Sequence, residues 1–155
     1  MNERKESTTS IILEYVRVVV LTVIATFIFL QFVQISRVNG SSMENTYFQN
    51  NIVLIDKVFY KHSQPKRNDI IIVDYDDGLD DTLIIKRVIA VGGDHLDIKN
   101  NEVYINGKKI KENYIKENMN TEDLSIDIPK GKVFVMGDNR NHSLDSRKLG
   151  YFDFD

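Results

Sequence analysis

The sequence contains no cysteine, and this absence excludes several kinds of site. Without thiols the chain has no disulfide framework, no cysteine nucleophile and no thiolate ligands for a metal. Histidine is scarce as well: His62, His95 and His142 are the only three, and their spacing fits no zinc site. We therefore expect neither a metal nor another cofactor.

An excess of charge of one sign is also missing. The formal net charge is −3 in 155 residues, so the composition does not indicate a nucleic-acid-binding protein. Hydrophobic residues make up 42% and charged residues 28% of the chain. These fractions are ordinary for a folded protein and exclude wholesale disorder. The length favours one domain, or two at most.

Charged residues are absent from residues 18–36, between Arg17 and Arg37. As a helix this segment would span about 28 Å, close to the thickness of a bilayer's hydrocarbon core. It is apolar on all sides, unlike an amphipathic core helix, and it is too long for the apolar region of a cleavable signal peptide. We therefore predict a transmembrane anchor at 18–36, after a short cytoplasmic N-terminus at 1–17 and before an extracytoplasmic domain at 37–155.

Basic residues near the anchor predict its orientation. Arg4, Lys5 and Arg17 precede it, whereas Arg37 alone follows it directly. Because lysine and arginine near a span favour the cytoplasmic side, we expect a single-pass cell-membrane protein with its N-terminus inside.

After the anchor, short runs rich in isoleucine and valine alternate with turn sequences, which is typical of β structure. Expected strands lie at residues 51–56, 69–75, 83–91, 102–105 and 132–136. Asn106-Gly107 is a strong hairpin signal. The acidic stretch 74–81 predicts a solvated loop, and residues 111–128 are polar with weak structural signals. The expected fold class is mostly β, with antiparallel pairing, behind one helix.

Within the expected strand at 83–91, two basic residues stand among aliphatic ones. Alternation places Ile84, Lys86 and Val88 on one face and Leu83, Ile85, Arg87, Ile89 and Val91 on the other. Charged residues can protect an exposed edge strand, but they can also act from a buried face. Burial lowers the pKa of a lysine, and its neutral amine then accepts a proton from a serine hydroxyl. Arg87 stays protonated and needs an acidic partner.

Two loops supply further polar groups. Residues 40–42, Gly-Ser-Ser, follow the anchor closely, and taken alone they describe a flexible loop. Residues 137–147, GDNRNHSLDSR, are dense in hydrogen-bonding side chains, although a polar turn with local caps would explain them equally well. In this second loop Asp138 is a candidate partner for Arg87.

Four segments in order behind the anchor resemble bacterial signal peptidase I. They are GSSMENT at 40–46, DKVFY at 56–60, KRVIAVGGD at 86–94 and GDNRNHSLDSR at 137–147. The resemblance implies a membrane-anchored Ser/Lys-dyad serine endopeptidase with an antiparallel, partial-barrel catalytic domain. It implies cleavage of N-terminal signal peptides from secreted preproteins at the outer face of the cytoplasmic membrane. The signal peptide would bind as an extended strand.

The same resemblance implies a role for individual residues. Ser42 matches the nucleophile, and its backbone N–H contributes to the oxyanion hole. Lys86 matches the general base, and Ser143 matches the serine that orients the lysine amine. Structural ion pairs are implied for Arg87 with Asp138 and for Asp145 with Arg147. The positions that line substrate pockets in relatives are Val38, Met43, Tyr47 and Ile85.

The chain departs from the pattern of the family in four ways. Gly40 supplies no side-chain donor where some relatives have a hydroxyl, Asn45 stands where proline is usual, and His142 stands where asparagine is common. The sequence ends at Asp155, whereas relatives usually continue with another short apolar segment. If that segment is missing, we expect an uncovered sheet edge and slow cleavage.

Two other functions compete with this one. A Ser/Lys autoprotease resembling the SOS-response repressors would share the dyad and the β fold. The apolar segment and the lack of a DNA-binding head argue against it. The other competitor is a membrane-anchored binding protein whose peptidase domain is weak or inactive.

Overall fold

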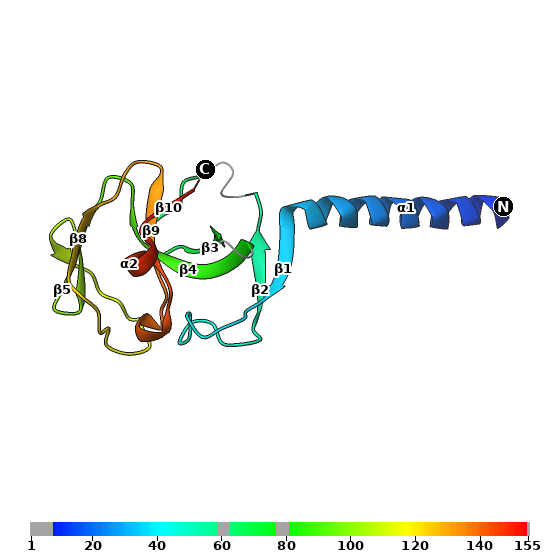
Figure 1. Ribbon diagram of the computed structural model, residues 1–155. Coiled ribbons are helices and arrows are strands. Elements are labelled where there is room, and N and C mark those ends of the chain that lie inside the picture. Colours follow the sequence, from blue (N-terminus) through cyan, green and yellow to red (C-terminus); the bar gives the residue numbers. More distant parts are fainter. Residues whose placement is uncertain (1–7, 59–62, 77–80, 155) are drawn as a thin grey trace.

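The computed structural model describes residues 8–58, 63–76 and 81–154, and Figure 1 shows a long helix that leads into a β domain. The elements in chain order are α1 (Thr8–Phe32), β1 (Val33–Arg37), β2 (Ile52–Asp56), β3 (Ile70–Asp76), β4 (Asp81–Val91), β5 (His95–Lys99), β6 (Glu102–Ile105), β7 (Lys108–Lys109), β8 (Leu124–Asp127), β9 (Lys132–Met136), the 3₁₀ turn η2 (Arg140–His142), α2 (Ser146–Leu149) and β10 (Phe152–Asp153). The predicted fold class is confirmed.

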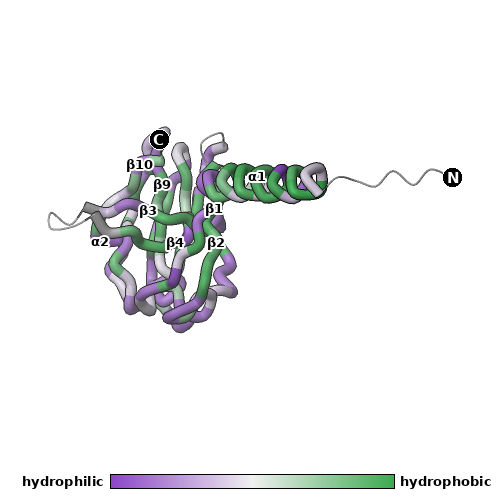
Figure 2. The backbone as a smooth tube through the Cα atoms, turned by 90° about the vertical axis from the view of Figure 1, so that its right-hand side faces the viewer, coloured by the Kyte–Doolittle hydropathy of each residue, from purple (hydrophilic) through white to green (hydrophobic). Residues whose placement is uncertain are grey.

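Helix α1 projects from one end of the β domain, and Figure 2 shows apolar residues along its length. None of its residues is buried, and it is long and apolar enough to cross a membrane. The helix ends at Phe32, so residues 33–36 of the predicted anchor belong to β1 instead. Val33 and Ile35 are β-branched and pair with β2, which favours a strand at this point.

Within the described residues the strands form three antiparallel sheets. Strand β1 pairs with β2, the second sheet has the order β10-β9-β4-β3, and the third has the order β7-β6-β5-β8. One buried apolar cluster joins the second and third sheets and includes Leu96, Ile98 and Phe134. Another, with Val88 and Val133, packs on the opposite face of β4 and β9. Strands β4 and β9 are therefore held from both sides where they pair, directly after Lys86 on β4.

A β-bulge interrupts β4 where it pairs with β9. Ile89 is the extra residue, between Val88 and Ala90. The bulge reverses the alternation of side chains, and Val91 packs against the same apolar cluster as Val88. The prediction that Val91 shares a face with Arg87 is therefore wrong, because simple alternation assumes an unbroken strand.

The five strands predicted from the sequence are present with small shifts at their ends. Asn106 and Gly107 connect β6 to β7 with φ of 52° and 76°, as a tight hairpin requires. The predicted loop at 74–81 overlaps β3 and β4, and residues 77–80 lie outside the described residues. Strands β1, β5, β7, β8 and β10 were not predicted. In β8 only Leu124 and Ile126 pack on the core. Two apolar residues in a strand of four give a weak sequence pattern.

Candidate active site

Ser42 lies in the loop between β1 and β2. Two backbone hydrogen bonds of 2.9 Å close the base of this loop, from Val38 N–H to the carbonyl of Asn51 and from Asn50 N–H to the carbonyl of Val38. Gly40 has a φ of 106°, a conformation that favours glycine, and it turns the chain just before Ser42. The serine is therefore presented by a closed loop.

Lys86 lies on β4, and its side chain reaches Ser42. The residue is 3% exposed, its Nζ lies 2.8 Å from Ser42 Oγ, and it donates to the Ile85 carbonyl at 3.0 Å. Burial lowers the pKa of Lys86 below its ordinary value of 10.5, although the negative charge of Asp145 acts in the opposite direction. A desolvated amine and a serine hydroxyl thus share a hydrogen bond, the arrangement that a base and its nucleophile need.

Ser143 lies next to Gly137 and Ser42. Its Oγ is buried and makes no hydrogen bond of standard geometry with the described residues. A Cβ on Gly137 would lie 2.3 Å from this oxygen and 2.5 Å from the Ser42 carbonyl oxygen. The missing side chain at Gly137 therefore allows Ser143 to approach the Ser42 loop.

Asp145 and Arg147 come together at the start of α2. Arg147 Nε and Nη2 each donate to the Asp145 carboxylate at 2.8 Å, and the Gly137 N–H donates to it at 3.0 Å. Burial opposes the ionisation of Asp145, but the Arg147 guanidinium and the Gly137 N–H hold its pKa below the ordinary value. The carboxylate thus ties Gly137 to α2.

Arg87 and Asp138 also come together, in the interior. Arg87 Nε and Nη2 donate to the two carboxylate oxygens of Asp138 at 2.8 Å and 2.7 Å. Asp138 has no exposed surface. The Thr46 hydroxyl donates to the same carboxylate. This pair therefore joins β4, the start of the 137–147 loop and the loop that carries Ser42.

Asn45 fastens the Ser42 loop in a different way from the proline that is usual at this position. Its φ of 90° is closed to proline, whose ring holds φ near −65°. Its Nδ2 donates to the carbonyls of Tyr114 at 3.2 Å and Ile115 at 3.3 Å. Side-chain hydrogen bonds to residues 114 and 115 therefore restrain this turn.

A cavity of about 220 Å³ opens beside Ser42 and Lys86. Three of the residues expected to contact substrate line it: Val38, Met43 and Ile85. The fourth, Tyr47, lines a neighbouring cavity of about 210 Å³, and Ile85 also belongs to its wall. Both cavities are smaller than typical small-molecule sites.

A buried ion pair near the site was missed in the sequence. The side chains of Arg140 and Glu112, only 1% and 9% exposed, pair at 2.5 Å. Glu112 lies in the polar stretch 111–128, where no periodic pattern predicts burial. No motif in the sequence marks this pair, whose members are 28 positions apart. Among the described residues, no cluster of three acidic or histidine side chains is suited to a metal.

Comparison with known proteins then decides the family. Residues 12–155 match the family described as "Signal peptidase, peptidase S26". The chain belongs to this family.

Several signal peptidases resemble the chain in sequence and structure. Signal peptidase I P from Bacillus subtilis subsp. natto is 32% identical over 164 residues, covering 98% of this chain and 88% of that protein. Signal peptidase I U from Bacillus subtilis (strain 168) is 39% identical over 119 residues, covering 71% and 63%. The crystal structure of a signal peptidase I from Enterococcus faecalis V583 matches with a TM-score of 0.51 at 29% identity, covering 59% of this chain and 92% of that one.

These matches confirm the predicted resemblance to bacterial signal peptidase I and the predicted enzyme class, a serine endopeptidase that cleaves signal peptides. The apolar helix α1 of this signal peptidase fits a membrane anchor. The roles of Ser42, Lys86 and Ser143 stay predictions, supported by the geometry of the site.

Proposed function

We propose that this signal peptidase cleaves secretory preproteins with Ser42 as the nucleophile and Lys86 as the general base. The 2.8 Å hydrogen bond between Lys86 Nζ and Ser42 Oγ carries the proposal, because the amine in it is only 3% exposed. Desolvation lowers the pKa of Lys86, so its amine is neutral at a pH where a surface lysine is charged. Only a neutral amine accepts the hydroxyl proton.

The reaction proceeds in two halves. Lys86 takes the Ser42 proton while Oγ attacks the carbonyl carbon of the scissile peptide bond. The resulting ammonium gives this proton to the leaving amine, the C–N bond breaks, and the signal peptide stays bound as an ester of Ser42. Lys86 then deprotonates a water molecule that attacks the ester, and the returning proton restores Ser42. No other reactant is needed.

The backbone N–H of Ser42 stabilises the oxyanion of each tetrahedral intermediate. This N–H has no hydrogen-bond partner among the described residues, so it is free to donate to a developing charge. Gly40 adds no side-chain donor two residues earlier. The oxyanion site of this chain therefore relies on backbone groups.

The preprotein binds as an extended strand along β4. Strand β9 pairs with β4 only from Arg87 onward, so residues 83–86 have no partner strand on that side within the described chain. An added peptide strand would satisfy these backbone groups, and its alternate side chains would point the same way. The cavities lined by Val38, Met43, Tyr47 and Ile85 then select small side chains one and three residues before the bond.

Ser143 orients the Lys86 amine, and two ion pairs hold Ser143 in place. Its buried Oγ retains unused hydrogen-bonding capacity beside the Ser42 loop. The Asp145–Arg147 and Arg87–Asp138 pairs fasten the two ends of residues 137–147. These pairs therefore hold Ser143 close to the Ser42 loop, from where we expect its hydroxyl to reach the Lys86 amine.

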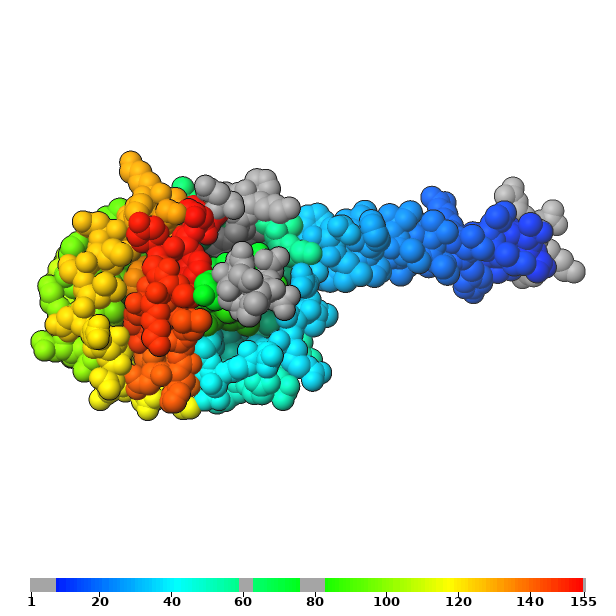
Figure 3. All heavy atoms as spheres, in the orientation of Figure 1, coloured from blue at the N-terminus to red at the C-terminus, as the bar shows by residue number. Residues whose placement is uncertain are grey.

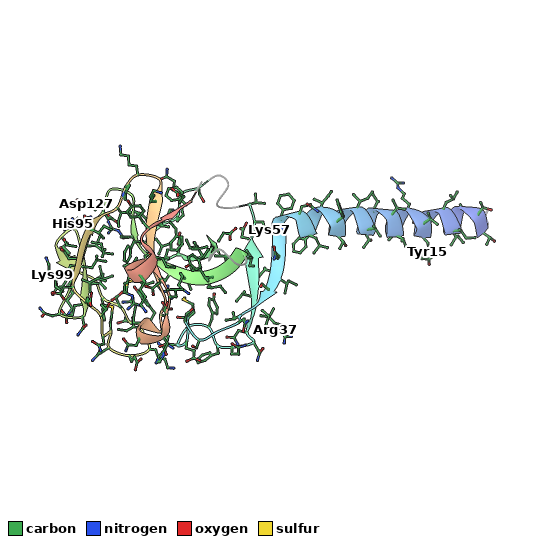
Figure 4. All side chains as sticks on the ribbon, in the orientation of Figure 1. Tyr15, Arg37, Lys57, His95, Lys99 and Asp127 are labelled. Atoms are coloured by element: carbon green, nitrogen blue, oxygen red, sulfur yellow. The ribbon has the colours of Figure 1, made fainter. Side chains whose placement is uncertain are left out.

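The β domain lies on the outer face of the cell membrane, with the N-terminus in the cytoplasm. Three basic residues precede the apolar part of α1: Arg4, Lys5 and Arg17. Figure 4 shows Lys57 close to the point where α1 meets the β domain, Arg37 at the opposite end of β1, and Tyr15 far along the helix. Lipid surrounds α1, and the preprotein's own apolar segment shares the bilayer, which raises the effective concentration of both partners.

Replacing Ser42 with alanine tests the proposal. The full chain in detergent is incubated with a preprotein, and the mature product is followed on a gel. Ser42→Ala lowers the cleavage rate by several orders of magnitude, whereas Ser41→Ala, at the exposed neighbouring serine, leaves it unchanged. Near-normal turnover by Ser42→Ala would remove Ser42 from its role.

A further inference from the structure

Residues 112–120 form a segment without regular secondary structure beside the active site, which we call the strap. In Figure 3 its yellow surface borders the orange surface of the 137–143 region. The Lys116 N–H donates to the Asp138 carbonyl at 3.1 Å, and the Lys116 ammonium pairs with Glu44 at 2.5 Å. The strap therefore contacts both loops that meet at the dyad.

The strongest of these connections is the pair between Glu112 and Arg140. Arg140 Nη1 and Nη2 donate to the two carboxylate oxygens of Glu112 at 3.0 Å and 2.5 Å. Because the Arg140 side chain is 1% exposed, its charge depends on a buried partner. Arg140 Nε donates in turn to the Gly137 carbonyl at 3.0 Å. Arg140 thus links the Glu112 carboxylate to the backbone carbonyl of Gly137.

Gly137 has little freedom to move without disturbing the reacting groups. Ser143 Oγ and the Ser42 carbonyl occupy the space that its Cβ would need. The Asn139 N–H, two positions later, donates to the same Ser42 carbonyl at 2.9 Å. A shift of the 137–140 turn would therefore displace Ser42 as well as Ser143.

Tyr114 gives Glu112 a second connection to the site. The Tyr114 hydroxyl donates to Glu112 at 3.0 Å. Its ring centroid lies 4.0 Å from Arg87 Cζ and 5.9 Å from Arg140 Cζ, within the range of cation–π attraction. The carboxylate thus orients a ring that packs on the Arg87 guanidinium.

We propose that Glu112 is a positioning residue of this signal peptidase. It acts through Arg140 and Tyr114, and it holds Gly137 where Ser143 and Ser42 are correctly placed. This inference rests on the function proposed above, because it needs the Ser42–Lys86 dyad to be the reacting pair.

The chain contains a matched control for Glu112. The Tyr104 hydroxyl donates to Glu102 at 3.1 Å, and Lys109 pairs with the same carboxylate at 2.5 Å. The residues therefore repeat the Glu-x-Tyr spacing and the cationic partner. The Glu102 and Lys109 side chains are 43% and 56% exposed, and neither lines the cavity beside Ser42 and Lys86.

The experiment compares Glu112→Gln with Glu102→Gln in the full chain, in one detergent and with one preprotein. We expect Glu112→Gln to lower kcat by about 10- to 100-fold with little change in KM, because misplacement by about 1 Å costs this much. Glu102→Gln keeps wild-type kcat. A wild-type kcat for Glu112→Gln overturns the proposal. The wild type and Ser42→Ala are measured in the same assay. If the wild type cleaves and Ser42→Ala does not, the proposed function holds, and a wild-type kcat for Glu112→Gln overturns only the positioning role.

A double variant separates positioning from the simple need to pair a buried charge. Glu112→Met/Arg140→Met removes both charges, so its Tm should return toward that of the wild type. Its kcat should stay low, because no side chain donates to the Gly137 carbonyl in place of Arg140 Nε. Recovery of both Tm and kcat overturns the positioning role. This variant also decides the question if Glu112→Gln does not fold.

Discussion

Replacing Lys86 with methionine separates the cost of burying an amine from its use in catalysis. Methionine is unbranched and apolar, so it suits a position that is 3% exposed and lies between Ile85 and Arg87 on a strand. It accepts no proton from Ser42. We therefore expect cleavage to fall by several orders of magnitude while the fold is kept.

The cost of burying the Lys86 amine is measured by how the free energy of unfolding depends on pH. Burial lowers the pKa of Lys86 in the folded chain, while the unfolded chain keeps the ordinary value of 10.5. Between these two pKa values the unfolded state binds one proton more than the native state. The free energy of unfolding therefore rises with pH in this window, by at most about 1.4 kcal/mol per pH unit. Lys86→Met lacks this increase, so its advantage over the wild type is largest at the acidic end.

Urea unfolding at several pH values from neutral to 10 measures this difference. The chain has seven tyrosines and no tryptophan, so tyrosine fluorescence or near-ultraviolet circular dichroism reports the transition. Parallel stability curves for the wild type and Lys86→Met would refute the lowered pKa. The kcat/KM profile of the wild type is a second check, because its acidic limb should titrate well below 10.5.

Two further substitutions probe the 137–147 loop. Gly137→Ala places a Cβ 2.3 Å from Ser143 Oγ and 2.5 Å from the Ser42 carbonyl, so kcat should fall about 100-fold; unchanged kcat would contradict this packing. Asp138→Asn leaves the Arg87 guanidinium without its buried carboxylate and should lower the free energy of unfolding by about 3–5 kcal/mol. Urea unfolding at neutral pH measures it, and a loss below about 1 kcal/mol would show that the pair is not essential.

The strands that sequence analysis recognised are those with strong local signals. After Lys132, strand β9 is an apolar run, and aliphatic residues flank Lys86 and Arg87 on both sides in β4, as expected for strands buried on both faces. Strand β8 and residues 112–120 were missed because their order comes from partners distant in the chain. The bulge at Ile89 was missed for a similar reason, since it depends on the register with β9.

The composition and order of the motifs determined much of the chemistry in advance. They identified an apolar anchor, a family resemblance and a serine and a lysine suited to one reaction. They did not predict how Asn45 restrains its loop, because its partners are carbonyls 69 and 70 positions away. A pattern of residue types contains no information about such hydrogen bonds.

The sequence by itself determined that a lysine stands in an aliphatic strand and that a serine follows a glycine near the anchor. Tertiary structure alone decided that these side chains meet across 44 positions and that the amine is desolvated. It also decided that Glu112 pairs with Arg140. The physical reason is the same in each case. A pKa and a buried ion pair depend on the atoms that surround a group in space, and chain neighbours supply only some of those atoms.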